Sequence, residues 1–82
     1  MTADLELLTR RGCHLCDQAL ARLRAAGLAP AVVDVDLDLA LLAEFDHRVP
    51  VLRLASTGEV VVEGVIDDAV IRDRVTPRLA DC

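Results

Sequence analysis

The order in which strand and helix patterns follow one another along the chain constrains its fold more than any other feature. Residues 4–9 and 31–36 have the alternation and apolar content of strands, and a helical pattern separates them. Two more apolar strands are predicted at 49–55 and 59–63, with only a Ser-Thr-Gly loop at 56–58 between them. A helical crossover joins parallel strands and a short loop joins antiparallel ones, so we expect a mixed sheet.

Apolar residues at helical spacing predict three helices, at 16–26, 37–45 and 67–76. Gly27 is a suitable stop for the first helix, and Asp38 is a suitable cap for the second. Asp67 or Asp68 can cap the third. Pro77 is expected to disrupt the continuation of that helix, because proline has no backbone N–H.

These elements predict an α/β protein with the order β-α-β-α-β-β-α, in which helices cover both faces of a four-stranded mixed sheet. We expect one domain, 1–82, because a chain of 82 residues buries only about 60–65% of its unfolded surface. With 54% hydrophobic and 28% charged residues, the composition is that of a globular protein rather than a disordered one.

The charge balance argues against nucleic acid as a partner. Nine Arg against fourteen Asp and Glu leave a net charge of −5, and the basic residues form no long block that could follow a phosphate backbone. Phe45 is the sole aromatic residue, so platforms for stacking bases are missing too.

The sequence also argues against a membrane partner. No apolar run approaches the roughly 20 residues of a membrane-spanning helix, and the first residues lack the basic and apolar segments of a secretory signal. We therefore expect a cytoplasmic protein. In a reducing cytosol, a close cysteine pair is more often catalytic or metal-binding than structural.

The segment Arg-Arg-Gly-Cys-His-Leu-Cys, residues 10–16, is the main candidate for chemistry. Cys13 falls between the first predicted strand and the first helix, and Cys16 lies within the first helical turn. Unpaired N–H groups and the helix dipole favour an anion there. Such positions can lower a cysteine pKa from about 8.5 to the range of roughly 3.5–7.5.

Neighbouring residues can assist a nucleophilic Cys13. Arg10 and Arg11 add positive charge, and Gly12 has no side chain to hinder the approach to the sulfur. Cys16 is close enough to attack a mixed disulfide on Cys13 and release the captured thiol. The first hypothesis is therefore a redox site with Cys13 as nucleophile and Cys16 as resolving thiol.

Other interpretations of the cysteine pair are open at this stage. Both cysteines can be small buried apolar residues. They can also form half of a metal or iron–sulfur site that His14, His47 or Cys82 completes, although the chain has no second close cysteine pair. A third alternative is a non-catalytic partner domain.

The charged candidates have alternatives of the same kind. Arg10 and Arg11 can be solvated charges at a strand end, and Asp67 and Asp68 can be helix caps without a ligand. His14 can tune the redox poise through its charge or can simply face solvent.

Val49-Pro50 opens the third predicted strand. Proline cannot donate a hydrogen bond to a sheet, so it fits a strand start, an edge or a bulge. Taken alone, an X–Pro bond is cis in only about 5–6% of cases.

Taken together, these features resemble those of a glutaredoxin. Thr-Arg-Arg-Gly-Cys-His-Leu-Cys after the first strand, Val-Pro at the third strand and an acidic pair before the last helix carry the resemblance, which spans nearly the whole chain. It implies a thioredoxin-like fold and a thiol–disulfide oxidoreductase that reduces protein or glutathione mixed disulfides. It also implies no tightly bound cofactor, with glutathione as a candidate co-substrate. We expect the protein to be a monomer.

The resemblance assigns roles to individual residues. It implies a cis Val49–Pro50 bond beside the nucleophilic sulfur, with the Val49 backbone pairing with the substrate. Arg10 falls where the family often has a lysine near the glutathione carboxylate, and Asp67 and Asp68 resemble the acidic pair that holds the glutamyl end. The predicted substrate-binding set is Arg10, Arg11, Gly12, His14, Val49, Pro50, Asp67 and Asp68, and no residue is assigned to a metal.

The chain departs from the usual family pattern at three places. The usual Cys-Pro-Tyr-Cys is Cys-His-Leu-Cys here, the Gly-Gly before the acidic pair is changed, and Arg48 replaces the Thr before Val-Pro. These differences concern glutathione binding more than the fold. The sequence is most similar to small bacterial glutaredoxin-like proteins.

Overall fold

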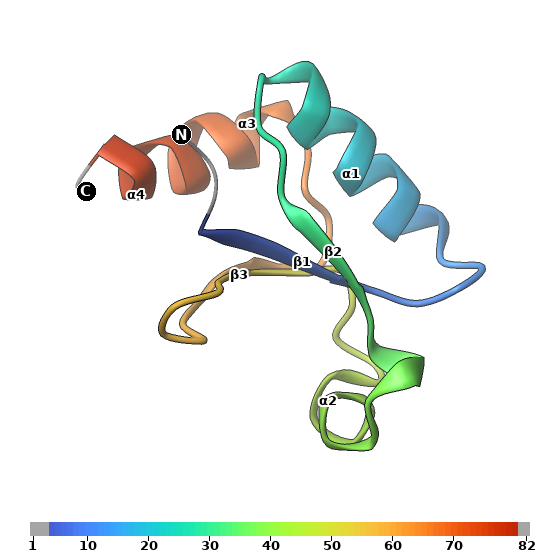
Figure 1. Cartoon of the computed structure of the whole chain (residues 1–82). Helices are drawn as coiled ribbons and strands as arrows, with labels where there is room; N and C mark the ends of the chain where they lie inside the picture. Colours follow the sequence, from blue (N-terminus) through green and yellow to red (C-terminus); the bar gives the residue numbers. More distant parts are fainter. Residues whose placement is uncertain (1–3, 81–82) are drawn as a thin grey trace.

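The computed structural model describes the backbone of residues 4–80 and the side chains of residues 4–79. Its strands are β1 (Leu5–Thr9), β2 (Ala31–Asp34), β3 (Val51–Leu54) and β4 (Val60–Glu63), which form one sheet in the order β2-β1-β3-β4. β1 is parallel to β2 and antiparallel to β3, and β3 and β4 form an antiparallel hairpin (Figure 1). The predictions of a mixed sheet and of the hairpin are confirmed.

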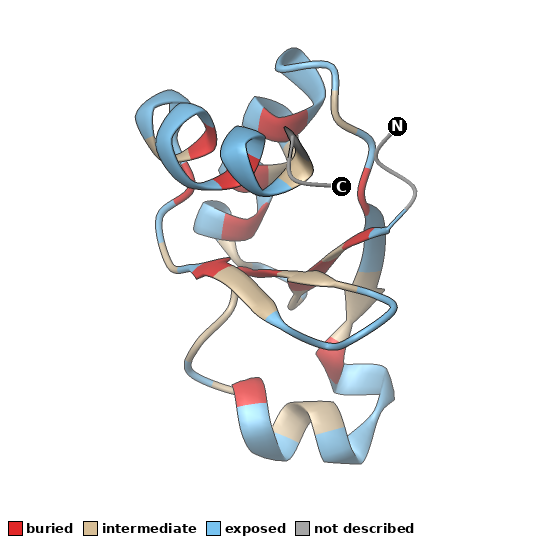
Figure 2. Ribbon diagram, turned by 90° about the vertical axis from the view of Figure 1, so that its left-hand side faces the viewer, coloured by how far each residue is buried: buried red, intermediate tan, exposed pale blue. Residues whose placement is uncertain are grey.

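Helices cover both faces of this sheet, as predicted. The α-helices are α1 (His14–Ala25), α2 (Leu39–Phe45), α3 (Asp68–Val70) and α4 (Thr76–Ala80). A 3₁₀ helix, η1 (Val35–Leu37), follows β2, and a π-helical segment, η2 (Ile71–Val75), joins α3 to α4. α1 and the α3–η2–α4 segment lie on one face of the sheet, and α2 lies on the other (Figures 1 and 2).

Each face of the sheet has its own hydrophobic cluster. The larger cluster contains Leu5, Leu7, Ala19, Leu23, Leu52, Val62, Ile66, Ile71 and Val75. The smaller cluster, beneath α2, contains Leu8, Val35, Phe45 and Val51. Successive strand side chains point to opposite faces, which is why adjacent leucines of β1 serve different clusters. Being central in the sheet, β1 needs apolar residues on both faces.

Aspartates cap two of the α-helices. The Asp38 carboxylate accepts the backbone N–H groups of Ala40 at 3.0 Å and of Leu41 at 3.2 Å, so it caps α2 as predicted. Asp67 caps α3 by accepting the N–H of Val70 at 2.9 Å. The sequence left Asp67 and Asp68 as alternatives for this cap, and the cap is Asp67.

The second strand is shorter than predicted. It ends at Asp34 instead of residue 36, because the Asp34 carboxylate accepts the N–H of Asp36 at 2.9 Å and starts η1. A short polar side chain that bonds its own backbone competes with the sheet ladder in this way. β3 is also shorter than the predicted 49–55, since it begins only after Pro50.

The prediction that Pro77 disrupts the last helix is wrong. The helical segment continues through Pro77 to Ala80. The π-helical turn lies directly before it, with the N–H of Thr76 donating to the carbonyl of Ile71. Pro77 therefore lies in the first turn of α4, where a missing N–H is tolerated.

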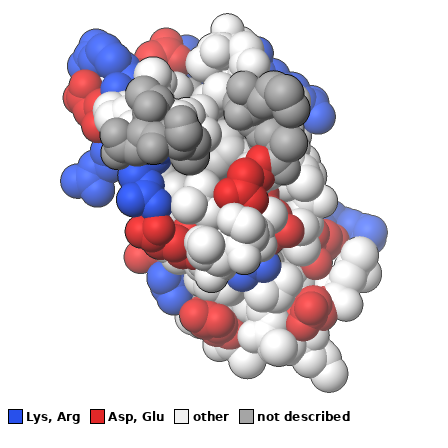
Figure 3. All heavy atoms as spheres, turned by 60° about the vertical axis from the view of Figure 1, so that its left-hand side comes forward, with Lys and Arg blue, Asp and Glu red and all other residues white. Residues whose placement is uncertain are grey.

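On the face shown in Figure 3, arginine and acidic side chains are interspersed among uncharged residues. Within residues 4–80, no helix is both long enough and apolar enough to span a membrane.

Candidate active site at one edge of the sheet

Several chain segments that are distant in sequence meet at one edge of the sheet. β1, β2 and β4 end there and β3 begins there, as shown by the pairs Thr9–Asp34, Leu8–Val51 and Val51–Glu63. The loop that leads from β1 into α1 leaves the sheet at this edge (Figure 1). The segments brought together are 10–16, 34–37, 48–50 and 63–65.

Cys13 and Cys16 form a disulfide at this edge, with their Cα atoms 5.2 Å apart. Cys13 is the N-cap residue of α1, and its sulfur accepts the backbone N–H of Cys16 at 3.1 Å. Gly12 has a φ of +78°, a left-handed conformation that favours glycine, and so lets the chain turn from β1 into the cap. The predicted placement of the two cysteines around the helix start is confirmed.

The two sulfurs differ in accessibility. Cys16 is 2% exposed and lies in the interior, whereas Cys13 is only half-buried. The alternative in which both cysteines are buried apolar residues therefore does not fit Cys13. A partner molecule in solution can reach Cys13 more readily than Cys16.

Arg10 contacts two carboxylates. Its Nε donates to Oδ1 of Asp36 at 3.1 Å, and its Nη1 donates to Oδ1 of Asp46. The hydrogen bond to Asp36 raises the pKa of Arg10 above its ordinary value, and the charges of Asp36, Asp46 and Asp34 act in the same direction. Arg10 thus ties the end of β1 to η1 and to the end of α2. Its neighbours Arg11 and His14 are exposed.

The Val49–Pro50 segment lies at the same edge of the sheet. The Val49–Pro50 peptide bond is cis, and Pro50 is buried. The carbonyl of Pro50 accepts the N–H of Gly64 at 2.9 Å, which joins this segment to the end of β4. Because Val51 pairs with Leu8, Pro50 lies at the sheet edge from which residues 10–16 depart.

Arg48, which precedes the Val49–Pro50 segment, contacts both β4 and α2. Its Nε donates to Oε2 of Glu63 at 2.6 Å, and its guanidinium carbon lies 4.7 Å from the centroid of the Phe45 ring. The backbone N–H of Arg48 also donates to the carbonyl of Phe45 at 3.0 Å. These contacts connect the Pro50 turn to α2 and to β4 at once.

Asp67 and Asp68, the predicted acidic pair, have partners outside the segment 10–16. Asp67 caps α3, and the Asp68 carboxylate accepts a hydrogen bond from Nη1 of Arg22 at 3.3 Å. Arg22 lies nine residues beyond Cys13, which is about 13 Å along the axis of a helix. The structure does not show these carboxylates in contact with residues 10–16.

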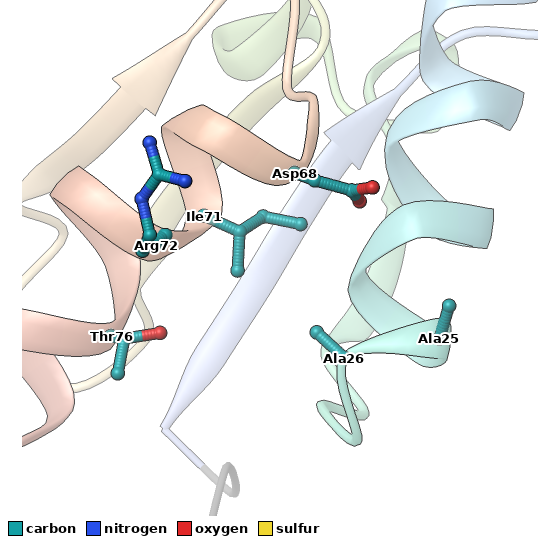
Figure 4. Close-up of a pocket in the computed structure, with 6 residues that line it drawn as sticks. All are labelled: Ala25, Ala26, Asp68, Ile71, Arg72 and Thr76. Atoms are coloured by element: carbon teal, nitrogen blue, oxygen red, sulfur yellow. The ribbon is translucent and has the colours of Figure 1, made fainter.

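Asp68 also lines a pocket of about 420 Å³ at the far end of α1. The lining residues, drawn in Figure 4, are Ala25, Ala26, Asp68, Ile71, Arg72 and Thr76. The pocket lies between the last turn of α1 and the α3–η2–α4 segment, and α1 is about 18 Å long. It is therefore separate from the disulfide.

Among the described residues, metal ligands are not gathered at the cysteine pair. Within residues 4–80, no group of three or more His, Cys, Asp or Glu side chains is arranged to hold a metal ion. Cys82, which the sequence offered as a further ligand, lies outside the described residues.

Comparison with known proteins identifies the family. The family model of the Glutaredoxin-like domain (DUF836) matches residues 4–76. The chain belongs to this family. This glutaredoxin-like domain is also similar to the X-ray structure of Northeast Structural Genomics target protein XcR50 from X. campestris. The identity is 35%, the match covers 95% of this chain and 97% of that chain, and the TM-score is 0.73. Among curated proteins, no match is found.

These findings confirm the predicted resemblance and the thioredoxin-like fold. A glutaredoxin-like domain with a C-x-x-C pair supports a thiol redox role. Sequence reasoning missed the charged contacts at this edge of the sheet, which join Arg10 to Asp36 and Asp46 and join Arg48 to Glu63. No local motif marks these residues, because each acts through a contact that only the folded chain creates.

Proposed function

We propose that this protein is a thiol–disulfide oxidoreductase in which Cys13 is the nucleophile and Cys16 is the resolving thiol. The main support is the Cys13–Cys16 disulfide at the start of α1, in which the more accessible sulfur occupies the cap position. Membership of the glutaredoxin-like family supports the same chemistry.

The reaction begins with the reduced protein. The Cys13 thiolate attacks one sulfur of a substrate disulfide, so a Cys13–substrate bond forms while the substrate S–S bond breaks. The departing sulfur keeps the electron pair and takes up a proton. Cys16 then loses its proton and attacks Sγ of Cys13, which releases the second substrate sulfur as a thiol. The substrate gains two electrons and two protons, and the protein is left with the Cys13–Cys16 disulfide.

A thiol reductant must then restore the dithiol. Two glutathione molecules or one dithiol protein would supply the two electrons, and the cytoplasm holds both classes of reductant. The protein needs no resident cofactor in this cycle.

The helix start favours the thiolate that the first step requires. The Cys16 N–H points at Sγ of Cys13, and the twelve-residue α1 directs its positive end toward the same atom. Arg11, exposed in the same segment, adds positive charge. Arg10 adds less than the sequence suggests, because two carboxylates surround it.

Two variants test this proposal in a disulfide-reduction assay. Cys13→Ser is expected to reduce the rate to nearly that of the reaction without protein, because the accessible thiol of the pair is removed and Cys16 is only 2% exposed. Cys16→Ser is expected to complete only the first step and to accumulate a mixed disulfide, which intact-protein mass spectrometry detects as added mass. Wild-type activity no higher than that of Cys13→Ser would overturn the proposal. Cys16→Ser recovered from cells would also carry the physiological substrate on Cys13.

A further inference from the structure

Two exposed apolar side chains lie at the edge of the sheet that carries the disulfide. Leu15 lies between the two cysteines and is 43% exposed, and Val65 lies in the loop after β4 and is 57% exposed. The Gly64 N–H donates a hydrogen bond to the Pro50 carbonyl, and this contact places Val65 next to the cis-proline segment. We refer to Leu15 and Val65 as the apolar rim. Large apolar side chains left exposed beside a reactive group are available to a partner of matching chemistry.

The charges around Arg10 are unfavourable for the carboxylates of glutathione. Arg10 carries one positive charge, and its partners Asp36 and Asp46 carry two negative charges, so the group has a net charge of +1 − 2 = −1. Asp34 adds a further negative charge close by. A carboxylate that approaches Arg10 therefore meets like charge and must displace an existing ion pair.

The two carboxylates that would bind the ammonium end of glutathione also have other partners in the structure. Asp67 is bonded to the backbone of α3, and Asp68 is paired with Arg22. Arg11 is an exposed cation beside the disulfide, but a single exposed cation attracts an anion without fixing its orientation. Together the charges offer little selective recognition of glutathione, whereas the apolar rim offers contact area.

From these contacts we infer the substrate class, on the basis of the proposed function. The preferred substrate is a polypeptide disulfide whose reacting cysteine is flanked by apolar residues, and it is preferred over a glutathione mixed disulfide. Its flanking side chains pack against Leu15 and Val65 while its sulfur meets Cys13. The exchange step and its electron balance are those given above.

The test measures single-turnover reduction with protein that has been reduced beforehand, so no regenerating system is needed. The substrates are three mixed disulfides with the same small leaving thiol: a Leu-Cys-Leu peptide, a Ser-Cys-Ser peptide and glutathione. Each rate constant is divided by the rate constant for dithiothreitol, which corrects for the intrinsic reactivity of the disulfide. The leucine peptide is expected to react about tenfold faster than either of the others, as partial burial of apolar side chains predicts.

Variants then assign the preference to the apolar rim. The double variant Leu15→Ser, Val65→Ser is expected to lose most of the tenfold preference. Leu39→Ser is the matched control, because Leu39 is 81% exposed but lies on α2, on the other face of the sheet. Equal rates for the three substrates, or a preference that survives in the double variant, would overturn this inference and leave the proposed function standing. Reduction that is equally fast in Cys13→Ser would overturn both.

Discussion

Phe45 shows how one buried side chain supports the edge that carries the site. It is 2% exposed and belongs to the smaller cluster with Leu8, Val35 and Val51. The Arg48 guanidinium covers its ring, a contact that contributes roughly 0.5–1 kcal/mol at an exposed site. The ring therefore anchors both α2 and the residue that precedes Val49–Pro50.

Replacing Phe45 tests how far the fold depends on this cluster. Phe45→Ala is expected to lower the free energy of unfolding by about 3–5 kcal/mol, because it leaves a cavity beneath α2. Urea unfolding followed by far-UV circular dichroism measures this, since the chain has no Trp or Tyr for fluorescence. Leu39→Ala is the control, with an expected change within about 0.5 kcal/mol. A loss no greater than that of the control would show that the smaller cluster contributes little.

At the residue scale, the sequence predicts the features that depend only on residues close together in the chain. Cys13, Cys16 and the turn at Gly12 follow from a short motif between a strand and a helix. The partners of Arg10 do not, because Asp36 and Asp46 are 26 and 36 positions away. The local sequence does not indicate which of the fourteen acidic residues will contact a particular arginine in the folded chain.

At the scale of elements, local rules account for most of the structure. Strand alternation, helical spacing and the aspartate caps predict the elements with differences mainly at their ends. The misplaced boundaries at Asp34 and Pro77 have a common origin. Each depends on how a few backbone groups share hydrogen bonds, through a side-chain turn in one case and a π-helical turn in the other.

The cap of α2 provides a direct test at this scale. Asp38→Ala is expected to lower the free energy of unfolding by about 1 kcal/mol, because two N–H groups lose their acceptor. Glu44→Ala removes the same charge from the exposed surface of the same helix without removing a cap. Urea unfolding curves of the two variants should differ by most of that amount. Identical curves would mean that Asp38 does not stabilise α2.

At the scale of the whole molecule, the sheet and the clusters on its two faces hold the fold together. The disulfide joins residues only three positions apart and links no distant segments. The order β2-β1-β3-β4 was not predicted, because a strand pattern indicates a strand but not its neighbours. Helices on both faces could be predicted, since strands with apolar residues on both sides must be covered twice.

Reduction of the disulfide is therefore expected to leave the fold intact. Closure of so short a loop contributes no more than about 2 kcal/mol in the chain-entropy model. The far-UV circular dichroism spectrum should be unchanged by reductant, and urea unfolding should remain cooperative with a slightly lower midpoint. Loss of the spectrum on reduction would show that the disulfide, rather than the packed sheet, maintains the structure.

The convergence of strand ends at one edge makes the Cys-His-Leu-Cys motif a poor candidate for transplantation. A synthetic peptide cut from this region would keep both thiols, yet Pro50 and Val65 would be left behind because separate strands deliver them. Grafting the motif onto another scaffold would copy its spacing without its surroundings. Transferring this chemistry to another protein requires the strand ends that meet at this edge of the sheet, and not only the Cys-His-Leu-Cys motif.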